Sequence, residues 1–368
     1  MRVLYWSELF WPHIGGVEVL SSQFIPAMRD RGHEFAVATS HTGRDLPDRE
    51  EWHGVPIHRF PFRQAIADGD LHAIARATRG VAALKREFQP ELVHVRMADP
   101  SVFFHLRTRD AHSCPLLVSV TVPPPEGGGG PDTLLDSVIS SAAWVTVNSE
   151  ALLHDLLRLA PEARGRASVI HPAEITPAVE PAPLPLEPPT ILCLGRVVGD
   201  KGFDLALAAF ARVRQIFETA RLVIAGDGPA RPELEAEALD LGLGEAVSFP
   251  GWVVPERVPD LINEATIVAI PSRWREAFCL VAVEAALMER PVVATAVGGL
   301  GESVADGETG LLVPLEDVEA LAGALLSLLR DPDRAAAMGR AGRARTMREF
   351  DHDAHIDAYA DVYARLAA

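Results

Sequence analysis

Cysteine is scarce in this sequence: Cys114, Cys193 and Cys279 are the only three among 368 residues. Three scattered cysteines are too few for a disulfide framework or a structural zinc site. No stretch reaches the roughly 18 uninterrupted apolar residues that a membrane-spanning helix needs. Glu8 also interrupts the first apolar run too early for the core of a signal peptide. We therefore expect a cytoplasmic protein without a stable membrane anchor.

Positive charge is also in short supply. The chain has 34 Lys and Arg residues against 51 Asp and Glu residues, which gives a formal net charge of -17. A surface that binds duplex nucleic acid needs many basic side chains to replace the counterions of the phosphates, so nucleic acid is not an expected partner. The same balance argues against a membrane surface, and we interpret the basic residues of the helix candidate 71–88 as a solvated face.

Strand candidates and helix candidates alternate over the whole length of the chain, of which 48% is hydrophobic. Such alternation predicts parallel sheets that are covered by helices on both faces. A chain of 368 residues exceeds what one hydrophobic core usually organises. We therefore predict two Rossmann-like domains, residues 1–174 and 190–346, joined by a proline-rich extended linker at 175–189. The ligand is expected in the cleft between them, at the carboxyl ends of the strands.

A pair of glutamates, Glu276 and Glu284, is the most informative motif. The strand candidate 265–270 leads through a short loop to Glu276, whereas Glu284 lies on the helix candidate that follows. Eight helical steps would span about 12 Å, so the two carboxylates are expected to hold different parts of one long ligand. Unpaired backbone N–H groups at the helix start favour an anion such as a diphosphate. These donors are the N–H groups of Phe278, Cys279 and Leu280. Taken alone, the pair could also be ordinary solvated helix charges.

A second motif supplies two cations. The short apolar run 190–194 ends in Gly195 and Arg196, and Lys201 and Gly202 then precede a helix candidate. A strand, a glycine turn, two cations and a helix predict a phosphate cradle, in which Arg is a planar fork and Lys a point charge. A surface loop could have the same composition. Glycine-rich turns also end three later strand candidates, at residues 226–229, 250–252 and 297–302.

The order of these segments closely resembles glycosyltransferase family 4, retaining enzymes of the GT-B fold that take a sugar from a nucleotide-sugar donor. The resemblance covers most of the chain and is strongest between residues 195 and 314. It includes the family's Glu-x7-Glu element at Glu276 and Glu284, and its Gly-Arg…Lys-Gly element at residues 195–202. It also includes the Val-Gly-Gly-x-x-Glu element at 297–302. In the first half, the opening strand, the turn at Gly15 and Gly16, and the run Arg31-Gly32-His33-Glu34 match as well.

The resemblance implies an α/β protein of the GT-B type, in which two Rossmann-like parallel-sheet domains face each other across a cleft. It implies that a C-terminal helix, residues 347–368, packs back on the N-terminal domain. The substrates would be a UDP-, GDP- or ADP-sugar donor and a sugar, lipid or small-molecule acceptor. No cofactor and no catalytic metal are expected, since enzymes of this kind generally need none.

By the same resemblance, two cations and two carboxylates divide the donor between them. Arg196 and Lys201 would stabilise the charge that develops on the leaving diphosphate. Glu276 would hold the hydroxyls of the donor sugar, and Glu284 would hold the ribose hydroxyls. The acceptor hydroxyl would attack on the side from which the diphosphate leaves, so no dedicated enzymic base is obligatory.

The remaining candidates each have two interpretations. Gly15 and Gly16 would present bare backbone to the donor phosphates and the acceptor, or would only permit a turn. Trp252 would contact the nucleobase of the donor, or would only pack against neighbouring side chains. Thr121 stands where the family commonly has a functional histidine after an N-domain strand, which puts the acceptor-side chemistry in doubt. Thr121 and His94 are therefore the acceptor-side candidates, although His94 could face the core.

Two alternatives to a glycosyltransferase remain open at this point. One is a sugar-nucleotide epimerase of the same fold, which would interconvert donors. The other is a binding protein that keeps the donor site but has lost transfer, which the replacement at Thr121 and the glycine- and proline-rich loop 123–131 would allow.

Overall fold

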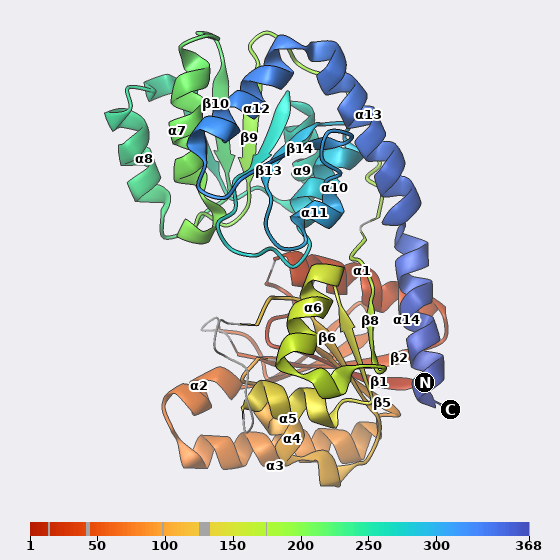
Figure 1. The fold of residues 1–368 in the computed structure, drawn as a ribbon. Helices are drawn as coiled ribbons and strands as arrows, with labels where there is room; N and C mark the ends of the chain where they lie inside the picture. The colour runs from red at the N-terminus through yellow and green to blue at the C-terminus, as the bar shows by residue number, and fades with distance from the viewer. Residues whose placement is uncertain (14, 42–44, 98, 125–132, 174, 368) are drawn as a thin grey trace. The chain divides into compact units, whose positions relative to one another are not determined.

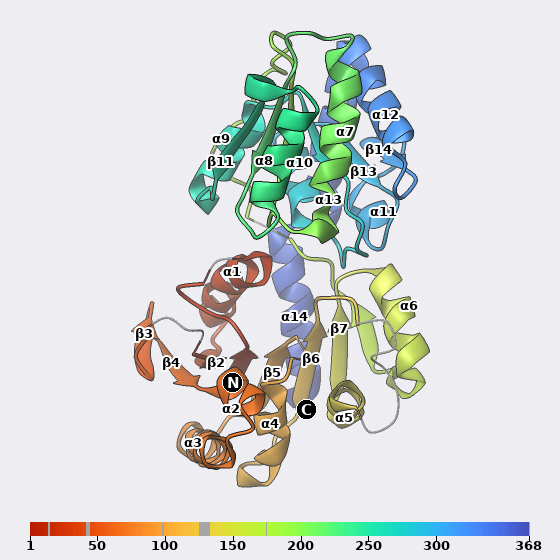
Figure 2. The ribbon, with the colours of Figure 1, turned by 90° about the vertical axis from the view of Figure 1, so that its left-hand side faces the viewer.

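The computed structural model describes residues 1–13, 15–41, 45–97, 99–124, 133–173 and 175–367. Most of the loop 123–131 lies outside these residues. The chain divides into two compact units, and Figures 1 and 2 show the elements of each. The first unit combines Met1–Pro172 with Asp353–Ala368, and the second is the continuous stretch Ala173–His352.

One sheet organises the described part of the first unit. Its strand order is β3-β4-β2-β1-β5-β6-β7-β8, and every pairing is parallel except that of β3 with β4. The central strands are buried along almost their whole length, as parallel strands covered on both faces are. The strands are β1 (Arg2–Ser7), β2 (Glu34–Ser40), β3 (Arg49–Trp52), β4 (Val55–Phe60), β5 (Leu92–Arg96), β6 (Leu116–Val120), β7 (Trp144–Val147) and β8 (Ala167–Val169).

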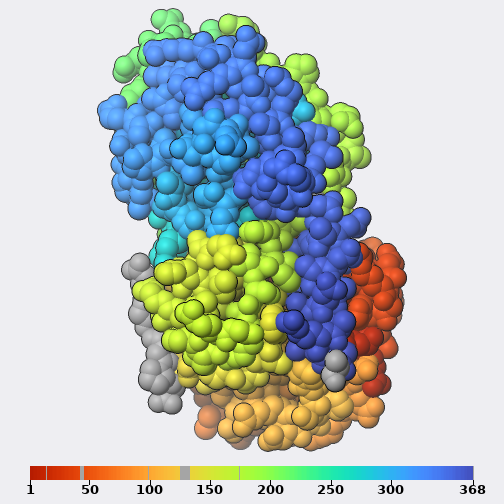
Figure 3. Space-filling model, turned by 45° about the vertical axis from the view of Figure 1, so that its right-hand side comes forward, coloured from red at the N-terminus to blue at the C-terminus, as the bar shows by residue number. Residues whose placement is uncertain are grey.

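Helices cover both faces of this sheet. On one face, α1 and the C-terminal α14 share a core with β1, β2 and β5, and Figure 3 shows α14, in dark blue, along the surface of the first unit. On the other face, Phe62 of α2 stacks on Trp6 and on Phe104 of α4. The helices are α1 (Gly16–Asp30), α2 (Phe62–Ala67), α3 (Leu71–Phe88), α4 (Val102–Arg107), α5 (Leu134–Ser141), α6 (Glu150–Leu159) and α14 (His352–Ala367).

The predicted C-terminal helix 347–368 is shorter than the sequence suggested. Phe350 and Asp351 interrupt the helical run, so Met347 belongs to the preceding helix and α14 begins at His352. Apolar and polar residues continue with helical spacing across the break, which is why the pattern alone does not reveal it.

A second sheet, entirely parallel among the described residues, organises the second unit in the order β11-β10-β9-β12-β13-β14. One apolar core lies between this sheet and α7, α8 and α12, and another lies between it and α9 and α10. The strands are β9 (Thr190–Leu194), β10 (Arg221–Ala225), β11 (Val247–Gly251), β12 (Ile267–Ile270), β13 (Val292–Thr295) and β14 (Gly310–Val313). The helices are α7 (Phe203–Arg214), α8 (Arg231–Asp240), α9 (Val258–Asn263), α10 (Leu280–Leu287), α11 (Leu300–Ser303), α12 (Val318–Arg330) and α13 (Pro332–Glu349). The prediction of two parallel sheets covered by helices is confirmed, apart from the antiparallel pairing of β3 with β4 in the first sheet.

The proline-rich segment 175–189 is fastened to the second unit rather than left as a free spacer. The buried Arg290 donates from Nη1 to the carbonyl of Ala182 over 2.8 Å and from Nη2 to the carbonyl of Asn263 over 2.7 Å. The side chain of Asn263 accepts from Ala182 N over 3.0 Å and donates to the carbonyl of Glu180 over 2.9 Å. These bonds satisfy backbone groups of an extended segment that has few strand partners.

Candidate functional site

Lys201 and Glu276 meet at the carboxyl ends of two neighbouring strands. Lys201 follows β9 and Glu276 follows β12, and because β9 and β12 pair directly, the loops behind them lie side by side. Lys201 Nζ lies 2.6 Å from Glu276 Oε1, with side-chain exposures of 25% and 16%. The fully buried Ser272 donates from Oγ to the same Oε1 over 2.6 Å. Two residues predicted for separate tasks are thus one ion pair in this structure.

The electrostatics of this pair keep the lysine charged. Burial lowers the pKa of Lys201, but the adjacent Glu276 carboxylate outweighs burial, and the pKa of the ammonium is raised overall. Arg196 is exposed and lies near enough for its charge to oppose that of Lys201. Within the described residues, the Arg196 guanidinium has no hydrogen-bond or ion-pair partner. Lys201 is thus paired with Glu276 while the nearby Arg196 charge is unpaired among the described residues, which leaves positive charge for an anionic ligand.

Glycines allow the backbone of three loops to pack around Glu276. A Cβ atom on Gly202 would collide with the carbonyl oxygen of Pro271, and Gly202 has a φ of 65°. A Cβ atom on Gly298, at a φ of 53°, would collide with the carbonyl oxygen of Glu276. That carbonyl also accepts a 2.7 Å hydrogen bond from Gly299 N. These glycines permit a close approach that no other residue allows.

The start of α10 is the predicted diphosphate position. α10 begins at Leu280 with Cys279 as its N-cap, and no side chain caps it. Phe278 is buried and packs edge to face on Phe350, with ring centroids 4.9 Å apart. Burial raises the pKa of the Cys279 thiol to about 12, so this cysteine contributes its backbone rather than a reactive sulfur.

Cys279 has a backbone conformation that suits glycine, with φ 90° and ψ 91°. A residue with a side chain in such a region is strained by about 1–3 kcal/mol, whereas glycine adopts positive φ freely. We expect Cys279→Gly to raise the thermal unfolding midpoint above that of Cys279→Ala, which also lacks the thiol but keeps the strain. An equal or lower midpoint for the glycine variant would contradict a strained N-cap.

Glu284 lies on α10 and is partly exposed. Burial raises the pKa of its carboxyl to about 7. Both Glu284 and Glu276 act electrostatically on the Cys279 thiol, so the two carboxylates bracket the start of α10 as the sequence predicts. Trp252 directly follows β11, at the edge of the sheet, and is 53% exposed. Within the described residues, no hydrogen bond or ion pair joins Trp252 to Lys201 or Glu276.

In the first unit, Gly15 is the N-cap of α1, and Gly16 is the first helical residue. Gly15 has an extended backbone that any residue can adopt, and a Cβ atom there would meet only the flexible carboxylate end of Glu18. Thr121 follows β6 and is 6% exposed. In the part of the chain that the structure describes, its Oγ1 atom is buried without a hydrogen-bond partner.

His94 is a core residue. It has no exposed surface, and burial lowers its pKa well below the usual value. Its Nδ1 lies 2.7 Å from Tyr363 Oη of α14, and its Nε2 lies 2.8 Å from Ser119 Oγ. Both ring nitrogens are engaged and no atom of the ring is exposed, so His94 is a structural residue and not an acceptor-side one.

Two buried acidic side chains lie near the carboxyl ends of β1 and β5, and the sequence does not predict this pair. Asp99 and Glu8 are 8% and 5% exposed. Burial and a hydrogen bond with Glu8 raise the pKa of the Asp99 carboxyl to about 8. Asp99 Oδ1 accepts from Ser101 N, and Glu8 Oε1 accepts from Ser40 Oγ. Burial therefore favours the neutral form of the Asp99 carboxyl, and no local sequence motif predicts this pair.

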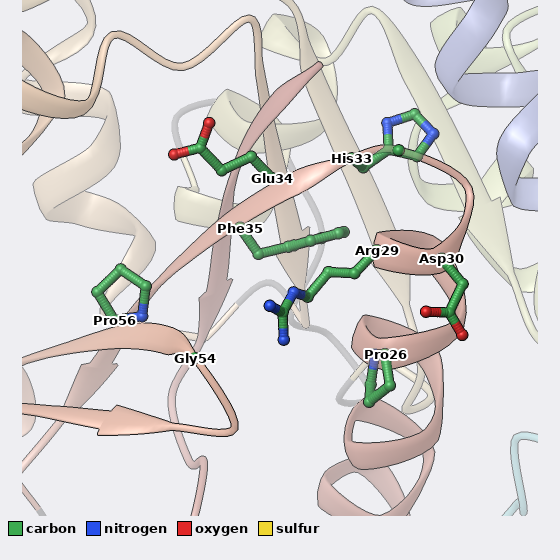
Figure 4. A pocket seen from close by; sticks show the side chains of 9 residues that line it. Pro26, Arg29, Asp30, His33, Glu34, Phe35, Gly54 and Pro56 are labelled. Atoms are coloured by element: carbon green, nitrogen blue, oxygen red, sulfur yellow. The ribbon is translucent and has the colours of Figure 1, made fainter.

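None of these residues lines the cavity drawn in Figure 4. It has a volume of about 550 Å³ and lies between the end of α1, the start of β2 and the turn between β3 and β4, where Arg29, His33 and Gly54 line it. This is the amino end of β2, opposite the edge where Gly15 and Thr121 lie. Among the described residues, no three His, Cys, Asp or Glu side chains gather as metal ligands would, and no helix is both long and apolar enough to cross a membrane.

Comparison with known proteins accounts for both halves of the chain. The family described as Glycosyl transferases group 1 matches residues 176–345, and the family described as Glycosyltransferase Family 4 matches residues 14–173. The GDP-mannose-dependent alpha-(1-6)-phosphatidylinositol monomannoside mannosyltransferase of Mycolicibacterium smegmatis is 40% identical over 161 residues, 42% of this chain and 42% of that protein. The matched part is thus less than half the length of this relative.

Solved structures share the fold over nearly the full length. Sucrose-phosphate synthase from Thermosynechococcus elongatus has a TM-score of 0.87 at 24% identity and covers 99% of this chain and 98% of its own. Anabaena HepE, in complex with UDP and glucose, has a TM-score of 0.83 at 22% identity and covers 99% and 100%. With both halves matched and the two-sheet fold in common, this chain belongs to the group 1 and family 4 glycosyltransferases and has their GT-B fold.

Proposed function

We propose that this protein is a retaining glycosyltransferase that moves a hexose-type sugar from a nucleoside-diphosphate sugar to a hydroxyl of an acceptor. The observation that carries the proposal is the 2.6 Å contact between Lys201 Nζ and Glu276 Oε1 at the ends of two adjacent parallel strands. A cation and a carboxylate so placed suit the junction between a diphosphate and a sugar, which present negative oxygens and hydroxyls to their surroundings.

Lys201 is suited to the leaving diphosphate. An ammonium has three N–H donors, and Glu276 accepts one of them, so the others remain for phosphate oxygens. Arg196 adds an exposed planar guanidinium beside it, and the uncapped start of α10 adds backbone donors. Fixed donors of this kind stabilise the charge that develops on the diphosphate as the bond to the sugar breaks.

Glu276 is suited to the donor sugar. Its Oε1 accepts from both Lys201 and Ser272, which fixes the carboxylate and leaves Oε2 to accept from a sugar hydroxyl. Ser272 is itself held, because Thr295 donates from Oγ1 to its carbonyl over 2.6 Å. A carboxylate supported in this way orients the sugar without a rearrangement during the reaction.

In the reaction, the bond between the anomeric carbon and the diphosphate oxygen breaks, and the acceptor oxygen forms a new bond on the same face of the sugar. The acceptor proton passes to the departing diphosphate oxygen, so the residues above need only bind, orient and supply positive charge. Glu284 on α10 would accept from the ribose hydroxyls, and the exposed Trp252 would stack on the base.

The names of the similar proteins include two different nucleotides. The Mycolicibacterium smegmatis relative is named as GDP-mannose-dependent, and HepE was solved with UDP and glucose. Both GDP- and UDP-sugars, together with ADP-sugars, therefore belong in the first screen.

The test is a binding and turnover screen over UDP-, GDP- and ADP-sugars, with and without excess EDTA. We expect one nucleotide to raise the melting temperature, its sugar to be transferred or hydrolysed, and the product to keep the anomeric configuration by NMR. EDTA should change neither binding nor turnover, because Arg196 and Lys201 supply the positive charge. Interconversion of donors without a glycosylated product would identify an epimerase, and binding without turnover would identify a binding protein.

A further inference from the structure

We propose that Arg273 is a positioning residue for the reaction, which holds the Glu276 loop against the Lys201 loop through paired contacts with Asp204 and Glu316. The catalytic part of this inference rests on the proposed function. Arg273 lies three residues before Glu276, in a stretch to which the sequence motifs assign no role. We call its contacts with Asp204 and Glu316 the Arg273 network.

The guanidinium of Arg273 donates hydrogen bonds to two carboxylates. Its Nη1 lies 2.5 Å from Asp204 Oδ1 and its Nη2 lies 2.6 Å from Asp204 Oδ2, which is the bidentate arrangement of the stronger arginine pairs. Its Nε lies 2.6 Å from Glu316 Oε1. Hydrogen bonds to Asp204 and then to Glu316 raise the pKa of Arg273, so the guanidinium stays charged.

The three members of the network come from three different segments of the second unit. Arg273 lies between β12 and α10, Asp204 lies in the first turn of α7, and Glu316 lies between β14 and α12. Asp204 is three residues from Lys201, just as Arg273 is three residues from Glu276. The Arg273–Asp204 pair therefore joins the segment that carries Glu276 to the segment that carries Lys201, and Glu316 holds the same guanidinium from a third segment.

Backbone contacts reinforce this connection. The N–H groups of Arg273 and Trp274 both donate to the carbonyl of Asp200, over 2.8 and 3.3 Å. Asp200 immediately precedes Lys201, and Gly202, on the other side of Lys201, packs against the carbonyl of Pro271. The two loops are thus joined on both sides of the 2.6 Å contact between Lys201 and Glu276.

The network is accessible to solvent, which makes it testable with salt. The side chains of Arg273, Asp204 and Glu316 are 30%, 36% and 51% exposed. Salt screens exposed charge pairs, whereas the backbone bonds to Asp200 persist. Losing the network should loosen the loop without unfolding the unit, since the apolar cores on both faces of the sheet do not include these side chains.

The first experiment measures loop order without any substrate. We expect the backbone amides of residues 273 and 274, measured in the peptide 271–279, to exchange deuterium faster in Arg273→Gln than in wild type. The matched control is Arg212→Gln, which removes a 2.6 Å ion pair with Glu319 between α7 and α12, away from both loops. Equal exchange of this peptide in the two variants would overturn the proposal, whether or not the protein proves to be a glycosyltransferase.

The second experiment measures turnover at saturating donor. Because displacing a reacting group by about 1 Å can cost up to about 100-fold, we expect Arg273→Gln to lower kcat about 10- to 100-fold. Arg273→Lys keeps the charge but cannot make the bidentate contact, so its kcat should lie between that of wild type and that of Arg273→Gln. Arg212→Gln should keep the wild-type kcat.

Two further readouts separate positioning from a general loss of structure. Asp204→Asn keeps the shape of the side chain at the start of α7. The kcat of the double variant Asp204→Asn with Arg273→Gln should be no lower than the kcat of Arg273→Gln alone. Raising the salt from about 0.05 M to about 0.5 M should lower kcat in wild type more than in Arg273→Gln, which has no network left to screen. Additive losses, or the same salt dependence in both proteins, would overturn the positioning role.

Discussion

Replacement of Lys201 by alanine is expected to lower kcat about 100- to 1,000-fold at saturating donor, the effect of removing one preorganised group that stabilises developing charge. The expectation follows from the raised pKa of the Lys201 ammonium, whose pairing with Glu276 outweighs burial and keeps it positive. Lys201→Arg keeps the charge but alters its geometry and should retain part of the activity. A kcat within about threefold of wild type for a folded Lys201→Ala protein would contradict this role.

The composition of the chain offers an independent probe of the same residue. Lys85 and Lys201 are the only lysines in the sequence. Lys85 is 1% exposed and donates to the carbonyl of His105, whereas the Lys201 side chain is 25% exposed. Bound nucleoside diphosphate should therefore slow the modification of Lys201 by an amine-selective acylating reagent and leave the modification of the buried Lys85 unchanged. Peptide mass spectrometry measures both sites in one sample, with Lys85 as the internal control.

Glu284→Ala is expected to weaken nucleoside-diphosphate binding by one to two decades. A lost charge-assisted hydrogen bond is worth roughly 1.5–3 kcal/mol, and the ribose offers two hydroxyls to this carboxylate. Glu276→Ala should instead spare the affinity for the nucleoside diphosphate and depress transfer, because its partner is the sugar. Titration calorimetry with UDP, GDP and ADP makes the comparison, and equal affinity for wild type and Glu284→Ala would refute the ribose assignment.

The pH dependence of the same binding follows from the pKa of Glu284, which burial raises to about 7. The ionised carboxylate accepts from both ribose hydroxyls, so binding favours the deprotonated form and lowers its pKa. Affinity should therefore rise with pH up to about 7 and level off above it, falling by up to about tenfold per unit below it. Glu284→Gln, which does not titrate, should lose this dependence. The number of protons released, measured in buffers of different ionisation enthalpy, checks the sign.

The parts of the site that the sequence predicts are those encoded locally. Strand, glycine turn and helix follow one another at Lys201 and again at Glu276, so each turn could be placed at the end of a strand. The glycine motifs at Gly202 and Gly298 were recognisable, and their reason is now visible in the backbone atoms that approach them. The ion pair between Lys201 and Glu276 depends on which strands are neighbours, which local patterns do not encode.

Other residues could not be assigned without the packed structure. His94 continues an alternating strand, and only the packing of Tyr363 from the distant α14 shows that it is buried. Arg273 stands between recognised motif residues, and its two carboxylate partners are 69 and 43 residues away in the sequence. The segment 175–189 has the composition of a spacer, yet Arg290 fastens it to the second unit. In each case the deciding partner is distant in sequence.

The C-terminal helix also has a consequence for the order in which the protein folds. Ile356, Tyr359 and Tyr363 of α14 are buried in the core of the first unit, and Tyr363 is the partner of His94. The ribosome makes residues 1–172 first, but that sheet must wait for residues 353–368 before its core can close. The second unit is continuous in sequence and can close earlier. During synthesis from the N-terminus, the part of this sheet that packs on α14 therefore stays uncovered until α14 emerges.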